Sequence, residues 1–309
     1  MAVSISKTPY GGWQGCYTLS NGKIEVVVTA DVGPRVIRFS LPGGANLFYE
    51  NPKGMGVTGG DKWVNFGGHR LWHSPEDPVR TYSPDNSPVK VDVLADGVIL
   101  TQPVEPDIGI EKQIELRVTD GAPHMKVIHR LRNTNQWAVT FAPWALSVMA
   151  SGGTAVVPLP PRGSHTENLL PKNNLALWAY TNMSDPRWTW GNKYVLLRSV
   201  PGAVPQKIGA SVPDGWAGYV LGGALFLKMF SLKAGAPYPD YGSNCEVFTN
   251  DVMLEVESLG PLAAVEPGAT VEHVEDWLLF GDVSAPARDI DVETQIMPRV
   301  HQAIALTGR

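Results

Sequence analysis

Side chains able to do acid, base or ligand chemistry are concentrated in residues 63–77. That segment holds rings, cations and acids in one short run: Trp63, His69, Arg70, Trp72, His73, Glu76 and Asp77. Catalytic and binding groups often lie on such irregular segments when a rigid scaffold holds them. The two histidines are four residues apart, which would suit zinc on a helix, but Gly67-Gly68 and Pro75 argue against a helix. We therefore expect no metal there, and a surface loop anchored by its tryptophans is an equally good interpretation.

Two glutamates later in the chain, Glu255 and Glu257, form a second candidate site. They lie two residues apart in a run typical of a strand, so their side chains share one face of a sheet. If that face is exposed to solvent, both glutamates are ordinary solvated charges. If it lines a pocket, the two like charges raise the pKa of one carboxyl, which then exchanges a proton near neutral pH. Glu246 lies in the preceding run, which predicts the partner strand.

A tryptophan-rich loop at residues 184–191 is the third candidate. Trp188 and Trp190 stand beside an Asp-Arg pair. Their rings could form a stacking wall for a partly apolar ligand, or they could close one end of the core. Other chemistries find no support, because the chain contains no phosphate-binding loop, no dinucleotide-binding fingerprint and no nucleophile elbow.

Turn signals between short apolar runs predict the scaffold that must position these groups. Runs such as 89–94 and 114–118 alternate apolar and polar residues, as strands with one buried face do. Tight turns separate such runs at five places, and their dipeptides are typical of two-residue hairpins. The turns are Asn21-Gly22, Asp96-Gly97, Asp120-Gly121, Gly222-Gly223 and Asn250-Asp251. This pattern indicates an antiparallel all-β chain.

The chain of 309 residues holds 32 Gly and 26 Pro spread along its length, which leaves little room for long helices. No linker-like segment or fixed-period repeat divides it. We therefore expect one all-β sandwich domain at residues 1–285. The tail at 286–309 differs, because 286–304 fits a helix broken or kinked at Pro298, which we expect to pack on the outside of the sandwich.

Composition excludes several classes of partner. The net charge is −5, so the basic surface that neutralises nucleic-acid phosphates is not expected. No run approaches the ~18 apolar residues of a membrane span, and the N-terminus lacks a signal-peptide core. The two cysteines, Cys16 and Cys245, cannot build a disulfide framework and agree with a reducing compartment. We therefore expect a cytoplasmic protein with no membrane partner; its oligomeric state stays open.

Several ordered motifs together resemble the galactose mutarotase-like (aldose 1-epimerase-like) superfamily and, within it, a bacterial branch. They span roughly residues 17–281 and run in the order 19–26, 33–36, 44–48, Gly67-Gly68-His69, Leu254-Glu255-Val256-Glu257, 266–270 and 274–280. Each motif alone is weak, and their order is the stronger signal. The resemblance implies a β-supersandwich, with a short helix at its end and a sugar-binding cleft on one sheet.

The resemblance also implies roles for particular residues. A mutarotase opens a sugar ring by removing a proton from the anomeric hydroxyl while supplying one to the ring oxygen. On this analogy Glu255 is the base and His69 or His73 the acid, and no cofactor is needed. A mono- or oligosaccharide would be the ligand, bound by polar and aromatic side chains: Arg70, Trp72, Glu76, Trp144, Trp188, Lys207, Glu246 and Glu257.

The sequence also departs from the family pattern. The region 133–146, where mutarotases carry a second histidine, offers Trp144 instead, and His129 lies upstream. A fold alone does not fix an activity, so two alternatives stay open beside an anomer-interconverting isomerase. One is a sugar-binding module without chemistry. The other is a lyase-type enzyme on acidic sugars, which Arg70, Arg80 and Lys207 could serve.

Overall fold

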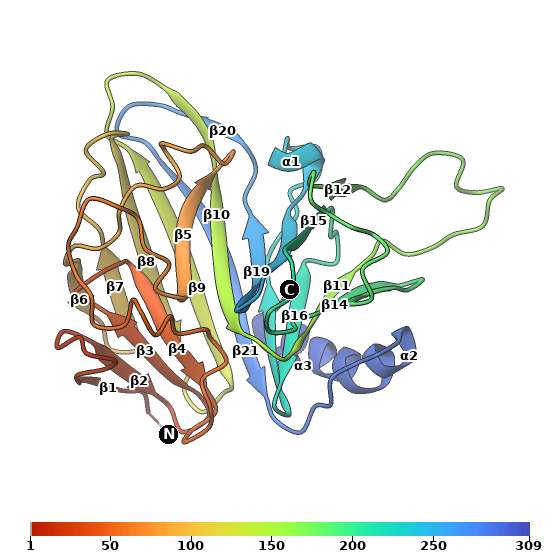
Figure 1. The fold of residues 1–309 in the computed structure, drawn as a ribbon, viewed down its shortest axis with the longest axis horizontal. Coiled ribbons are helices and arrows are strands. Elements are labelled where there is room, and N and C mark those ends of the chain that lie inside the picture. Colours follow the sequence, from red (N-terminus) through yellow and green to blue (C-terminus); the bar gives the residue numbers. More distant parts are fainter. Residues whose placement is uncertain (1) are drawn as a thin grey trace.

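A computed structural model describes residues 2–309 and confirms the all-β supersandwich, with two large antiparallel sheets facing each other (Figure 1). The first sheet has 11 strands. In spatial order they are β1 (Ser4–Lys7), β2 (Tyr17–Ser20), β3 (Glu25–Thr29), β4 (Arg35–Ser40), β5 (Gly68–Ser74), β10 (Val139–Ala150), β19 (Met253–Leu259), β18 (Cys245–Thr249), β15 (Gln206–Ala210) and β12 (Leu175–Leu177), with β20 (Ala263–Val265) paired to β10.

The second sheet has 10 strands. Their order is β13 (Trp188–Trp190), β14 (Tyr194–Arg198), β11 (Thr154–Pro158), β16 (Trp216–Leu221), β17 (Ala224–Met229), β21 (Thr270–Phe280), β9 (His124–Asn133), β8 (Ile110–Val118), β7 (Gly97–Thr101) and β6 (Lys90–Val93). All five predicted hairpins are confirmed, because the strands flanking each turn pair antiparallel: β2 with β3, β6 with β7, β8 with β9, β16 with β17, and β18 with β19.

The main core fills the space between the sheets. Phe39 and Phe48 on the side of the first sheet contact Phe226 and Trp277 of the second sheet, with ring centroids 5.6–5.8 Å apart. The rings of Phe226 and Trp277 also contact each other, at 5.4 Å. Aromatic rings of this size bury large apolar areas and prefer such tilted and edge-on contacts. The two buried cysteines are free thiols, so apolar packing rather than cross-linking holds the sheets together.

The tail is helical from residue 289. It comprises α2 (Asp289–Asp291), a π-helical turn (Val292–Ile296) and α3 (Met297–Thr307), and a short turn of helix, α1 (Pro239–Gly242), lies earlier in the chain. Pro298 is the second residue of α3 and directly follows the π-helical turn, so the helical tail is irregular next to this proline. Ile296 and Val300 are fully buried against the outer face of the second sheet, whereas Ile290 is exposed. No helix in the described part of the chain is long and apolar enough to span a membrane.

Candidate functional site

Strand alternation divides the centre of the first sheet into an inner and an outer face. His69 on β5 and Ser258 on β19 reach the second sheet, where they contact His129 and His273. Successive side chains of a strand point to opposite faces, so the residues next to these belong to the outer face. Register across β5, β10, β19, β18 and β15 then assembles one outer group: Arg70, Trp72, Trp144, Leu146, Glu246, Phe248, Glu255, Glu257 and Lys207.

A cleft of about 310 Å³ lies on this outer face. Its walls combine six aromatic side chains with six polar or charged ones. They comprise Trp63, Asn65, Arg70, Trp72, Glu76, Tyr82, Trp144, Leu146, Tyr180, Lys207, Phe248, Asn250, Met253 and Glu255. An adjoining hollow of about 490 Å³ shares Glu76, Tyr82 and Trp144 with it and adds Trp178. Aromatic walls with a few convergent polar groups are typical of small-molecule sites.

Arg70 and Glu255 form the ion pair on one side of the cleft. Nη2 of Arg70 donates to Oε1 of Glu255 over 2.9 Å, and both side chains are nearly buried. The guanidinium lies over Trp72 at 4.2 Å and over Trp63 at 5.4 Å from the ring centroids. Its Nε and Nη1 are buried without a hydrogen-bond partner in the described chain. Rings and carboxylate thus fix a planar cation that keeps unused donors beside the cleft.

Lys207 organises the other side. Its Nζ is 2.7 Å from Oε2 of Glu246 and 3.2 Å from Oε2 of Glu257. It also lies over the rings of Trp144 and Trp178, at 4.7 and 4.6 Å. The indole N–H of Trp144 donates to Oε2 of Glu257 over 2.7 Å. One ammonium therefore holds two carboxylates and packs against two aromatic walls.

The buried charges of the outer face are not balanced. Glu246, Glu255 and Glu257 provide three carboxylates, whereas Arg70 and Lys207 provide two cations. Burial raises the pKa of Glu255, with Glu257 adding to the rise and Arg70 opposing it. Burial raises the pKa of Glu246 well above its ordinary value, although Lys207 opposes this. Burial in a group with more carboxyls than cations therefore favours the protonated forms of Glu246 and Glu255 relative to an exposed carboxyl.

Lys207 keeps its charge although it is buried. Burial disfavours the charge on Lys207, but Glu246 and Glu257 outweigh burial and raise the pKa of the lysine. At the cleft rim, Tyr82 donates its hydroxyl to Oε1 of Glu76. Burial raises the pKa of Tyr180 to about 12. Lys207 is therefore a persistent cation, and the tyrosines remain hydroxyl donors at physiological pH.

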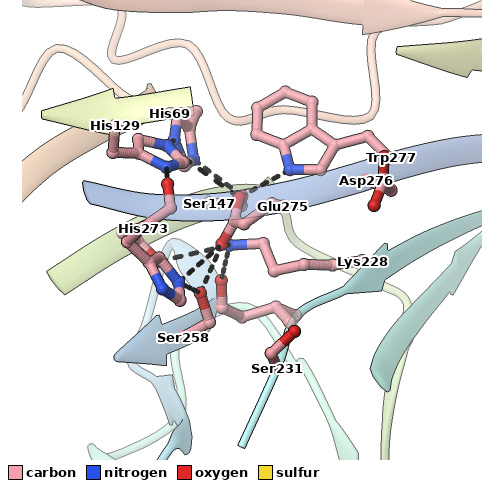
Figure 2. Close-up of polar contacts among 12 residues, drawn as sticks. His69, His129, Ser147, Lys228, Ser231, Ser258, His273, Glu275, Asp276 and Trp277 are labelled. Atoms are coloured by element: carbon pink, nitrogen blue, oxygen red, sulfur yellow. Dashed lines mark hydrogen bonds and ion pairs between the residues drawn. The ribbon is translucent and has the colours of Figure 1, made fainter. Parts of the chain in front are cut away.

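The two predicted acids, His69 and His73, do not reach this cleft, which corrects the expected pairing with Glu255. His69 is fully buried on the inner face, where Nδ1 lies 2.9 Å from the Ser147 hydroxyl (Figure 2). His73 shares that face of β5 and packs against Phe141. Burial lowers the pKa of His73 to about 3. The physical reason is the two-residue strand period: placing Arg70 and Trp72 in the cleft turns both histidines inward.

His69 instead joins a buried polar cluster between the sheets (Figure 2). Nδ1 of His129 lies 3.0 Å from the backbone carbonyl of His273, so that nitrogen carries a proton and donates it. Nε2 of His129 is then the acceptor for Nε2–H of His69, 2.7 Å away. Ser147 donates to the remaining nitrogen of His69. Each ring nitrogen therefore has a partner, as buried polar groups require.

His69, His129 and Glu275 could in principle bind a metal, because their ligand atoms lie within 4.8 Å of one another. Glu275, however, already accepts from Trp277 Nε1 over 2.6 Å and lies 3.0 Å from the ammonium of Lys228. A metal cation there would face that ammonium and would have to displace satisfied hydrogen bonds. The contacts thus favour a hydrogen-bonded structural network over a metal centre.

Two other predicted ligands have different places. Trp188 belongs to the main core, stacks on Trp190 at 5.1 Å and donates to Gln206, so it does not line the cleft. This corrects its expected role in a stacking wall and agrees with the alternative that it closes the core. Glu76, by contrast, lines both hollows from the loop after β5.

Several cleft residues were not expected from the sequence. Phe248 could have been found, because it lies two residues after Glu246 and so shares its face of β18. Trp63 stands in the segment already singled out, but without a periodic pattern to orient it. Tyr82 and Tyr180 come from loops, whose positions over the sheet depend on tertiary packing.

The fold is that of galactose mutarotase-like proteins. A galactose mutarotase-like protein from Lactobacillus casei has 11% identity and a TM-score of 0.57, covering 86% of this chain and 100% of its own. A putative aldose 1-epimerase from Escherichia coli K12 has 11% identity and a TM-score of 0.54, covering 90% and 100%.

A TPR-domain containing protein from Parabacteroides distasonis also matches, with 13% identity and a TM-score of 0.55 over 89% of this chain. The present chain spans about half of that protein, 49% of its length. A scan against protein-family models finds no match, and a search of curated proteins finds none either. The likeness therefore lies in the fold.

Proposed function

We propose that the protein is carbohydrate-active and interconverts sugar anomers, as an aldose 1-epimerase-like isomerase. The observation that carries this proposal is Glu255, a nearly buried carboxyl of raised pKa that lines an aromatic cleft beside Arg70. The cleft volume of about 310 Å³ suits one sugar ring. Flat rings such as Trp72 and Trp144 complement the apolar faces of a pyranose, while the charged groups bind its hydroxyls.

In this proposal Glu255 is the general base. Its carboxylate takes the proton of the anomeric hydroxyl as the bond between C1 and the ring oxygen breaks. Lys207 takes the role expected of the histidine: its ammonium donates a proton to the ring oxygen and takes it back when the ring closes. The open-chain aldehyde turns about its C1–C2 bond and closes by the reverse steps, so the proton balance is restored. Such acid and base groups typically accelerate a reaction by about 10² to 10⁴.

A second candidate function is a sugar-binding module without chemistry. Among residues 2–309 no histidine lines the cleft, and both cleft cations are already paired with carboxylates. This arrangement is also what a binding surface would need. The excess of buried carboxylates speaks against the third alternative, an enzyme on acidic sugars, because it repels a uronate. Arg80, expected to serve such a sugar, pairs with Asp77 in an exposed position.

The test follows anomer exchange of unmodified aldoses by NMR exchange spectroscopy or polarimetry. We expect the enzyme-dependent rate to fall by about 10² or more in Glu255→Gln and in Lys207→Met. Glu272→Gln is the matched control, because Glu272 is an exposed glutamate on β21 that pairs with Arg130 on β9. Equal rates in the wild type and Glu255→Gln would remove Glu255 from the mechanism. Calorimetric binding of a sugar with exchange at the buffer rate would favour the module.

A further inference from the structure

A second, smaller pocket shares no lining residue with the aromatic cleft. It has a volume of about 90 Å³ and is formed by Gly33 and by parts of two proline-rich segments, 84–87 and 102–106. The first segment lies in the connection from β5 to β6, and the second in the connection from β7 to β8. These two stretches are distant in sequence and meet only in the folded chain.

Three residues that line this pocket each carry an acceptor oxygen without a hydrogen-bond partner. These oxygens are Oδ1 of Asp85, Oε1 of Gln102 and Oε2 of Glu105, each unpartnered within the described chain. The side chains are strongly buried, since the three residues are only 7%, 6% and 2% exposed. Buried polar groups are normally hydrogen-bonded, so three orphaned acceptors around one small pocket require an explanation.

The orientation of these oxygens is fixed by the bonds that their partner atoms make. Oε1 of Glu105 accepts from Nζ of Lys112 over 2.6 Å and from Nε2 of Gln102 over 3.2 Å. Turning the Gln102 amide around would set its oxygen against that carboxylate oxygen, so the amide oxygen stays free. The other carboxylate oxygen of Asp85, Oδ2, accepts from the buried guanidinium of Arg35.

We propose that this pocket binds a hard, oxygen-preferring metal cation of the calcium type. Two carboxylate oxygens and one amide oxygen are the ligands such an ion prefers, and water can complete its coordination. The cluster of His69, His129 and Glu275 differs in character, because it offers two imidazole nitrogens and only one carboxylate. Arg35 and Lys112 neutralise the two carboxylates, which makes the site weak, with a dissociation constant on the order of 10⁻⁴ to 10⁻³ M.

The bound cation would stabilise the rim of the cleft. Asp85 lies in the same connection as Glu76 and Tyr82, which line the cleft. Arg35 extends this link, because its guanidinium also donates to the carbonyl of Gly67, directly before β5. The cation would therefore join the rim-bearing connection to the turn that carries Glu105.

The test is calorimetric titration of the EDTA-treated full chain with calcium chloride, and with magnesium and sodium chloride for comparison. We expect one calcium ion per chain and weaker binding of the other two. Gln102→Glu adds a charged ligand and should tighten calcium binding about tenfold, whereas Gln102→Met removes the oxygen and should weaken it about tenfold. Asp92→Asn is the matched control and should change nothing, because Asp92 is a partly exposed carboxylate paired with Lys90.

Two outcomes would overturn the site. One is the lack of calcium binding up to about 10 mM by the folded wild type, which would leave water as the occupant. The other is binding that neither Gln102 variant alters, which would place the ion elsewhere. Hydrogen exchange tests whether the cation stabilises the rim. Calcium should slow amide exchange in residues 75–88, and unchanged exchange at saturating calcium would refute the stabilisation of the rim. These readouts are independent of the proposed isomerase activity.

Discussion

Removing the ammonium of Lys207 should destabilise the fold in a way that depends on pH. In the wild type, Nζ of Lys207 lies 2.7 Å from Glu246 and 3.2 Å from Glu257. Lys207→Met keeps most of the side-chain length but leaves both carboxyls without this shared cation. At an effective dielectric constant of about 20, each contact contributes about 5 to 6 kcal/mol before the cost of burying the ammonium. Desolvation offsets much of this, and removing one partner of a buried pair typically costs about 3 to 5 kcal/mol. We expect a loss of that size at pH 8.

The pH dependence follows from the carboxyls left behind. Burial already raises the pKa of Glu246, with Lys207 opposing the rise, so the variant should raise it further. A carboxyl whose pKa is higher in the folded than in the unfolded state favours folding below its unfolded pKa and loses that contribution as pH rises through the folded value. The destabilisation should therefore be largest at pH 8 and shrink toward pH 5.

Chemical denaturation of both proteins at pH 8 and pH 5 measures these differences. Lys126→Met on β9, where the lysine is exposed, is the matched control and should stay within about 0.5 kcal/mol of wild type. Adding Glu246→Gln to Lys207→Met should recover part of the loss, because one unpaired carboxylate is then removed. A loss under about 1 kcal/mol at pH 8, the range of exposed pairs, would refute the reasoning, as would equal losses at both pH values.

Three further expectations test other parts of the structure. His69→Phe should lower the free energy of unfolding by about 1 to 3 kcal/mol, because it breaks buried hydrogen bonds, and should leave the sugar affinity measured by calorimetry unchanged. A loss of affinity without a loss of stability would indicate that His69 takes part in sugar binding. Ile296→Ala should cost about 2 to 5 kcal/mol in chemical denaturation because Ile296 is fully buried, whereas the exposed Ile290→Ala should cost little, and equal costs would contradict the packing of the tail. The proposed anomer exchange needs ionised Glu255, so its rate should rise with pH through a midpoint above 4.5, given the raised pKa of that group; a rate independent of pH would count against Glu255 as the base.

Local patterns were sufficient to predict much of the fold. The five turn dipeptides and their flanking β-branched runs specify hairpins whose strands pair within a few residues of each other, so sequence distance is no obstacle. The helical tail was also readable, since Ile296 and Val300 repeat at helical spacing and are the residues buried on the second sheet. The break or kink expected at Pro298 falls where the π-helical turn ends and α3 begins.

The candidate site was predictable only in part. Period-two alternation places Glu255 and Glu257 on one face of β19, and the structure has both on the outer face of the first sheet. The same rule applied to β5 separates Arg70 and Trp72 from His69 and His73. The sequence alone, however, gives no indication of which of these two sets faces the cleft, and the family resemblance assigned members of both sets to the site.

The sequence by itself determined the strand-and-turn composition and which side chains share a strand face. Only the tertiary structure decided which face of β5 meets Glu255 on β19, which loops bring Tyr82 and Tyr180 over the sheet, and where Trp188 packs. The reason is physical: alternation along a strand is set by local backbone geometry, whereas the facing of one strand toward another depends on burial and register between segments separated by up to 185 residues.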